Sequence, residues 1–113
     1  MNKYRDKSDF EINCQVLATF EPDIEHMCLS NDKKSFYHCG FDGNGFYETT
    51  IPDYCNNPAD AMPIINEYGI SLVYQDRQFQ FATNDGNIEC SVSNPLKAAM
   101  IIFLMMKDAE NEK

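Results

Sequence analysis

The sequence predicts an α+β fold, in which an antiparallel sheet of about five strands packs against three helices in the order α-β-β-α-β-β-β-α. Three observations predict it. Helix-opening signals occur at three points, two aromatic-rich segments flank a glycine-containing turn, and three later segments alternate apolar with polar residues. One sheet covered by helices would bury all of the apolar faces. The 113 residues contain no linker, so a single domain is expected over residues 1–113.

The first helix is expected to begin at Ser8. Ser8 and Glu11 have the spacing of a capping box, in which each side chain accepts a hydrogen bond from the other residue's backbone amide. Apolar residues then recur at helical spacing, at Ile12, Val16, Leu17 and Phe20. Pro22 ends this helix, and residues 1–7 before it are expected to fray. For residues 27–29, a short strand and a loop packed on the core are both open interpretations.

A β-hairpin is predicted next. Residues 36–41 and 46–51 are rich in aromatic and β-branched side chains. Between them lies Asp42-Gly43-Asn44-Gly45, whose glycines permit the positive φ angles of a tight turn. The two segments are therefore expected to pair as antiparallel strands.

A second helix and a three-stranded meander follow. Asn57 and Pro58 have the order of an N-cap and a first helical residue, and Gly69 suits the position after the last turn. Pro63 lies inside this helix and is expected to bend it. The strands place their apolar residues at Ile70, Leu72 and Tyr74, at Phe79 and Phe81, and at Ile88, Cys90 and Val92. The turns between them are too short for a parallel crossover, so the meander is antiparallel.

The closing helix is the most apolar segment. It is expected to begin at Asn94 and Pro95 and to end near Asp108, with residues 109–113 frayed. Residues 96–106 leave almost no polar stripe, and a helix that is apolar all round must be buried all round. Either the other helices and the sheet enclose it, or part of it pairs with a second copy of the chain. The second interpretation predicts a homodimer, with an interface that includes Ile101, Ile102, Leu104 and Met105.

The charge balance indicates the class of partner. There are 9 basic and 18 acidic residues, a net charge of −9, and residues 35–76 contain no Lys or Arg. Such a surface repels phosphates, so binding to nucleic acid is not expected. It attracts a basic protein, although acidity that only keeps the chain in solution is an alternative interpretation.

Neither export nor a membrane segment is expected. The first nine residues contain no apolar stretch of the secretory type, and the longest apolar run, residues 98–106, is half of what a membrane-spanning helix needs. We therefore expect a cytoplasmic protein. Its five cysteines are an odd number and widely spaced, which favours reduced thiols over a disulfide framework.

No metal or cofactor is expected. His26 and Cys28 are two positions apart and His38 and Cys39 are adjacent, and neither pair has the spacing of zinc ligands. Glycine-rich nucleotide-binding motifs are absent from the sequence.

The connector before the second helix carries the candidate site. It contributes the candidate binding residues Asp53, Tyr54, Cys55, Asn56 and Asp60. Another interpretation is structural, with polar side chains that cap the helix and a tyrosine that covers the core edge. A third makes Cys55 the nucleophile of a small thiol-dependent hydrolase, with His26 or His38 as the base.

Three segments carry a family resemblance: residues 54–65 (YCNNPADAMPII), 69–72 (GISL) and 94–100 (NPLKAAM). In these segments, within the second half of the chain, the sequence resembles the small NinX-like proteins of lambdoid phages and prophages. The resemblance implies a phage-encoded accessory protein of the bacterial cytoplasm with an α/β sandwich fold, and it supplies no catalytic residues. We therefore predict a non-enzymatic homodimer that binds a basic host protein, with the thiol-dependent hydrolase as the alternative.

Overall fold

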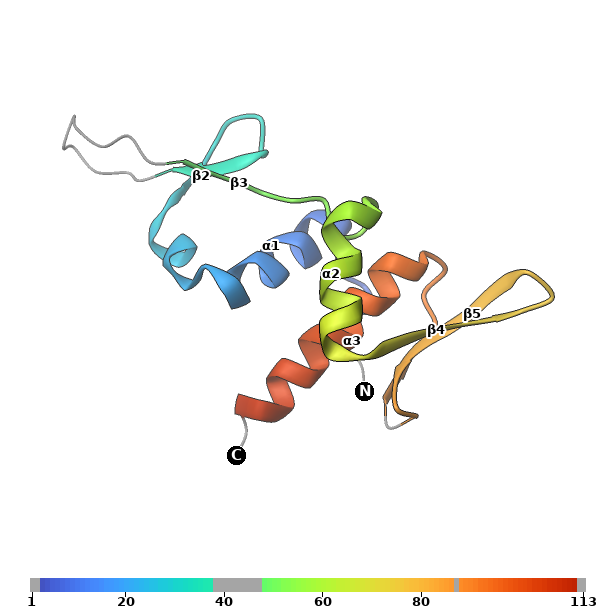
Figure 1. The fold of residues 1–113 in the computed structure, drawn as a ribbon. Helices are drawn as coiled ribbons and strands as arrows, with labels where there is room; N and C mark the ends of the chain where they lie inside the picture. Colours follow the sequence, from blue (N-terminus) through green and yellow to red (C-terminus); the bar gives the residue numbers. More distant parts are fainter. Residues whose placement is uncertain (1–2, 38–47, 87, 112–113) are drawn as a thin grey trace.

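The computed structural model describes residues 3–37, 48–86 and 88–111. The elements in chain order are α1 (Asp9–Phe20), a 3-10 helix η1 (Pro22–His26), β1 (Cys28–Leu29), β2 (Ser35–Tyr37), β3 (Glu48–Thr50), α2 (Pro58–Tyr68), β4 (Ile70–Gln75), β5 (Gln78–Asn84), β6 (Ile88–Cys90) and α3 (Pro95–Asn111). Figure 1 shows the three helices between two small sheets. The predicted α+β class is confirmed.

The helices begin where the capping signals predict. The Glu11 amide donates to Ser8 Oγ at 3.1 Å, and the Ser8 amide donates to Glu11 Oε1 at 3.0 Å, which completes the capping box of α1. Asn57 accepts from the Ala59 amide at the start of α2, and Gly69 ends that helix with a φ of 65°. Glycine adopts this left-handed conformation without a steric penalty.

The prediction of one five-stranded sheet is wrong. The strands form two separate antiparallel sheets of three, in the orders β1-β2-β3 and β4-β5-β6. Residues 28–29 supply the extra strand, since Cys28 pairs with Tyr37 and Leu29 with Phe36. The predicted hairpin turn at residues 42–45 lies outside the described residues.

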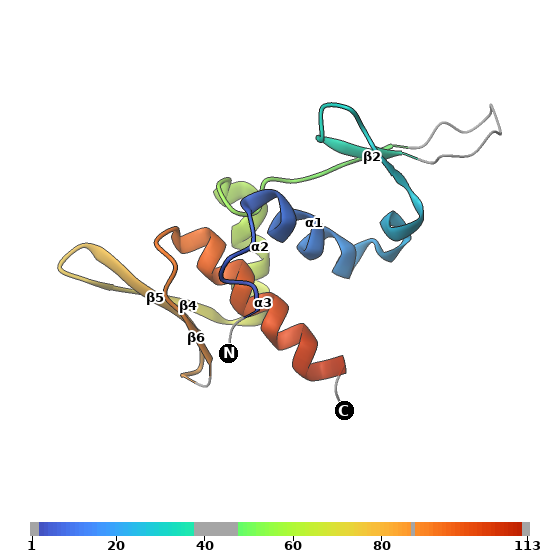
Figure 2. The same cartoon turned by 180° about the vertical axis from the view of Figure 1, so that it is seen from behind.

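The separation of the sheets has a physical reason. Local turns determine each hairpin, whereas pairing between the first hairpin and the meander would be a non-local contact that no feature of the sequence specifies. In Figures 1 and 2 the two sheets lie at opposite ends of the helical layer, and the strands that α3 contacts closely are β4, β5 and β6 of the second sheet.

The core is built around α3. From Ala98 to Phe103 every side chain has 0% exposure, and Leu104 has 4%. Helices α1 and α2 pack on one side of α3 and the second sheet packs on the other. The chain itself therefore encloses this helix. Within the described residues, no helix is both long enough and apolar enough to cross a membrane.

Both ends of the described chain are held together. Tyr4 is buried, and its hydroxyl donates to Asp108 of α3 at 2.5 Å. Lys3 lies 3.4 Å from the same carboxylate. The segment before α1 is thus docked on α3, which continues to Asn111, three residues past the predicted end.

Candidate functional site

The predicted connector lies where the first turns of α1, α2 and α3 meet. The Cys55 amide donates to Asn13 Oδ1 at 3.0 Å, and Asn94 Nδ2 donates to the Cys55 carbonyl at 2.7 Å. The Asn13 amide group also donates to Asp53 Oδ1 at 3.1 Å. Both backbone groups of Cys55 therefore have side-chain partners, one from α1 and one from the cap of α3.

The more exposed polar side chains at this meeting point also bind one another. Asn56 Nδ2 donates to Asp9 Oδ2 at 3.1 Å and to Asp53 Oδ1 at 3.2 Å. Lys97 lies 3.1 Å from Asp9 Oδ1. The hydrogen bond from Asn56, followed by the contact with Lys97, lowers the pKa of Asp9. We call these residues, with Asn13, Cys55 and Asn94, the polar junction.

The polar junction holds three helices together, which agrees with the structural interpretation of the connector. Of the candidate binding residues, Asp53, Cys55 and Asn56 belong to it. Sequence reasoning missed Asn13 and Asn94 as partners. Asn13 offered a signal, because it follows Ile12 on the apolar side of a predicted helix, where a polar residue needs a partner.

Cys55 lacks the properties of a catalytic thiol. Its exposure is 0%, and burial, together with the charge of Asp9, raises the pKa of its thiol to about 12. Reactive cysteines are partly exposed and have lowered pKa values. The Cys55 thiol donates a hydrogen bond to the Asp9 carbonyl, with 3.7 Å between Sγ and the oxygen. His26 lies exposed on η1, and His38 lies outside the described residues.

Cys55 should therefore resist alkylation in the folded protein. With a pKa of about 12, only about one thiol in ten thousand is ionised at pH 8, so labelling is expected to be at least about a thousandfold slower than for free cysteine. Iodoacetamide labelling followed by peptide mass spectrometry measures this for each cysteine, and unfolding in urea should remove the protection. Native labelling at the rate of free cysteine would restore the hydrolase interpretation.

Among the described residues, the other cysteines and His26 do not gather as a metal site would. Cys14 and Cys90 are free thiols, as is Cys55, whereas Cys28 is disulfide-bonded, so the expectation of reduced thiols is wrong at Cys28. In the parts of the chain that the structure describes, no three His, Cys, Asp or Glu side chains gather as metal ligands would.

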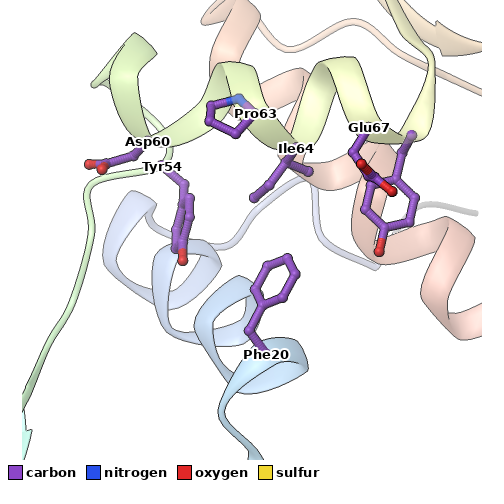
Figure 3. A pocket seen from close by; sticks show the side chains of 7 residues that line it. Phe20, Tyr54, Asp60, Pro63, Ile64 and Glu67 are labelled. Carbon is purple, nitrogen blue, oxygen red and sulfur yellow. The ribbon is translucent and has the colours of Figure 1, made fainter.

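A groove lies between the end of α1 and the outer face of α2, and Figure 3 shows it from close by. Its volume is about 470 Å³. Its lining combines aromatic, aliphatic and acidic side chains, namely Phe20, Tyr54, Asp60, Pro63, Ile64, Glu67 and Tyr68. Two predicted site residues, Tyr54 and Asp60, are therefore brought together here.

The order of residues along α2 gives this groove its chemistry. Asp60, Pro63, Ile64 and Glu67 are spaced i, i+3, i+4 and i+7, which places them on one face of the helix. Opposite them, Phe20 is 47% exposed, although its ring stacks on Phe103 with 5.6 Å between centroids. A carboxylate thus stands at each end of an apolar strip.

The charged side chains that line the groove, Asp60 and Glu67, are both acidic. Burial raises the pKa of the Tyr54 hydroxyl, and the nearby charges of Asp60 and Glu21 raise it further. None of α1, η1 and α2 contains a Lys or Arg. Lys107 of α3 approaches the far end, where its Nζ lies 4.9 Å from the Tyr68 ring centroid and 3.6 Å from Glu110. The sequence signal for this groove was the spacing of the α2 residues together with an apolar Phe20 next to Pro22.

The predicted dimer residues lie mostly inside the chain. Ile101 and Ile102 have 0% exposure and Leu104 has 4%. Met105 is half-buried and borders a second hollow of about 350 Å³ beside Ile88. The homodimer stays a prediction, with Met105 as its accessible member.

The comparison with known proteins follows the resemblance seen in the sequence and extends it. The family model described as "Bacteriophage P22, NinX" matches residues 3–107, which is nearly the whole chain and includes α1, both sheets and the groove. No curated protein and no solved structure matches the chain. This chain belongs to the NinX family of phage proteins.

Proposed function

We propose that this phage accessory protein is a non-enzymatic binding module, which holds a basic segment of a host protein on its acidic α1–α2 face. One observation carries the proposal: the groove between α1 and α2 is apolar inside, acidic at both ends and walled by helices without a single Lys or Arg. A surface with this pattern raises the rate of encounter with cations and then offers apolar area for contact.

The charges around the groove support a protein ligand rather than a nucleic acid. The acidic residues in or beside the groove include Asp60, Glu67 and Glu21, and η1, which follows α1, adds Asp23 and Glu25. Phosphates would be repelled by all of them. Acidity that served solubility alone would not require an apolar hollow between the carboxylates of Asp60 and Glu67.

A salt-dependent titration tests this proposal. The immobilised full chain is used to capture host proteins, and each captured protein is purified and titrated against the free chain by isothermal calorimetry. Raising the salt from about 50 to about 300 mM should weaken binding by about tenfold or more, because rim charges are screened.

Two variants of equal charge change make the test specific to the face. The variant Glu21→Gln with Glu67→Gln should weaken the complex, whereas Asp76→Asn with Glu89→Gln, which changes exposed carboxylates of the second sheet region, should not. Equal weakening by both pairs, or an affinity that ignores salt, would contradict the proposal.

A further inference from the structure

We infer that the groove seats one helix of the partner, and that this helix carries two basic residues seven positions apart with a large apolar residue between them. This rests on the proposed function and adds the chemical pattern of the ligand. Figure 3 shows the carboxylates of Asp60 and Glu67 at the two ends of the groove, with Ile64 between them and Phe20 opposite.

The spacing of the α2 residues determines the spacing of the ligand. Asp60 and Glu67 are seven residues apart on one helix face, which separates them by about 10 Å along the axis. A helix that lies along α2 repeats the same rise, so its residues at i and i+7 face the two carboxylates together. In an extended segment, residues seven positions apart would point to opposite faces, so the two basic side chains could not both reach the carboxylates.

The apolar middle of the groove requires an anchor. Pro63 and Ile64 lie between the carboxylates along α2, and Figure 3 shows the Ile64 side chain directed toward the Phe20 ring. The groove has a volume of about 470 Å³. This space admits a leucine or phenylalanine side chain from position i+3 or i+4 of the ligand helix. Helices that bind in grooves present their anchors with this spacing.

The aromatic rim tolerates a cation. Lys107 already places its Nζ 4.9 Å from the Tyr68 ring centroid, within the range of a cation–π contact. Its charge is opposed by Glu110 at 3.6 Å, so Glu67 keeps its carboxylate for a ligand. The opposite end, beside Asp60, has the further negative charge of Glu21.

Two helical peptides of identical composition test the inference. The matched peptide has Arg at i and i+7 with Leu at i+3 and i+4, and the permuted peptide moves one Arg by two positions, which places it on the opposite face of the helix. Fluorescence polarisation with the full chain should give an affinity at least about tenfold higher for the matched peptide. Equal affinities would overturn the inference that the groove seats a helix with this spacing, but would leave charge-driven binding to the acidic face intact. If neither peptide binds, the result counts against the proposed function as well.

A charge exchange tests the register. Glu67→Lys should weaken the matched peptide, and a peptide with Glu in place of the Arg that faces Glu67 should recover the affinity. Asp76→Lys is the control, because it makes the same charge change outside the groove. If the Glu-substituted peptide binds Glu67→Lys and Asp76→Lys with equal affinity, the inference of a seated helix is refuted. Circular dichroism of each variant checks that the fold is retained.

Discussion

Replacing Phe103 by alanine is expected to lower the free energy of unfolding by about 3–5 kcal/mol. Phe103 lies in the centre of α3 with 0% exposure. Its ring stacks on Phe20 at 5.6 Å and meets the edge of Tyr68 at 4.9 Å, so the truncation removes contacts with α1 and α2 together. Small domains have total stabilities of about 5–15 kcal/mol, and this variant should approach the limit of folding.

Phe20→Ala is the matched control for this variant, because it removes the other ring of the same stacked pair. Phe20 is 47% exposed, so its loss should cost less than about 1.5 kcal/mol. Urea titrations followed by circular dichroism measure both values. A cost below about 1 kcal/mol for Phe103→Ala would contradict an enclosed α3. A midpoint that rises with protein concentration would show that a second copy contributes to burial.

Asn94→Ala is expected to cost about 2–3 kcal/mol, more than an ordinary helix cap. Asn94 Oδ1 accepts from the Leu96 amide at 3.0 Å and caps α3. Its Nδ2 donates to the Cys55 carbonyl at 2.7 Å and to Asn56 Oδ1 at 3.0 Å. Alanine therefore removes the cap and leaves a carbonyl of the polar junction without this donor.

Comparison with Asn57→Ala separates the contribution of the polar junction to stability from that of an ordinary helix cap. Asn57 caps α2 through one hydrogen bond from the Ala59 amide at 3.0 Å and is exposed, so alanine there should cost about 1 kcal/mol. Asn94→Ser should fall between the two values, since serine keeps the cap oxygen but not the amide donor. The same urea titrations apply. Equal costs for Asn94→Ala and Asn57→Ala would show that the junction adds nothing beyond a cap.

The candidate site could be predicted in part. The five predicted residues of the connector divide between two surroundings, since Asp53, Cys55 and Asn56 belong to the polar junction while Tyr54 and Asp60 line the groove. Their division depends on which way each side chain faces once α1 docks on α2. The same holds for Phe20. Helical spacing places it on the apolar face of α1, but the sequence does not show that nearly half of its side chain stays exposed.

Local features of the fold followed from the sequence. The caps at Ser8, Asn57 and Asn94, the left-handed Gly69 and the antiparallel meander all depend on residues a few positions apart, and all are confirmed. The family also followed from short segments of the chain and is now supported over residues 3–107.

Tertiary structure alone decided the arrangement of these parts. Two sheets formed in place of one, because strand pairing across α2 depends on contacts between distant residues. The apolar α3 could have been covered by its own chain or by a second copy, and its composition is the same in both cases. Packing by α1, α2 and the second sheet covers Ile101 and Ile102 completely, and the partly apolar groove beside Phe20 stays on the outside.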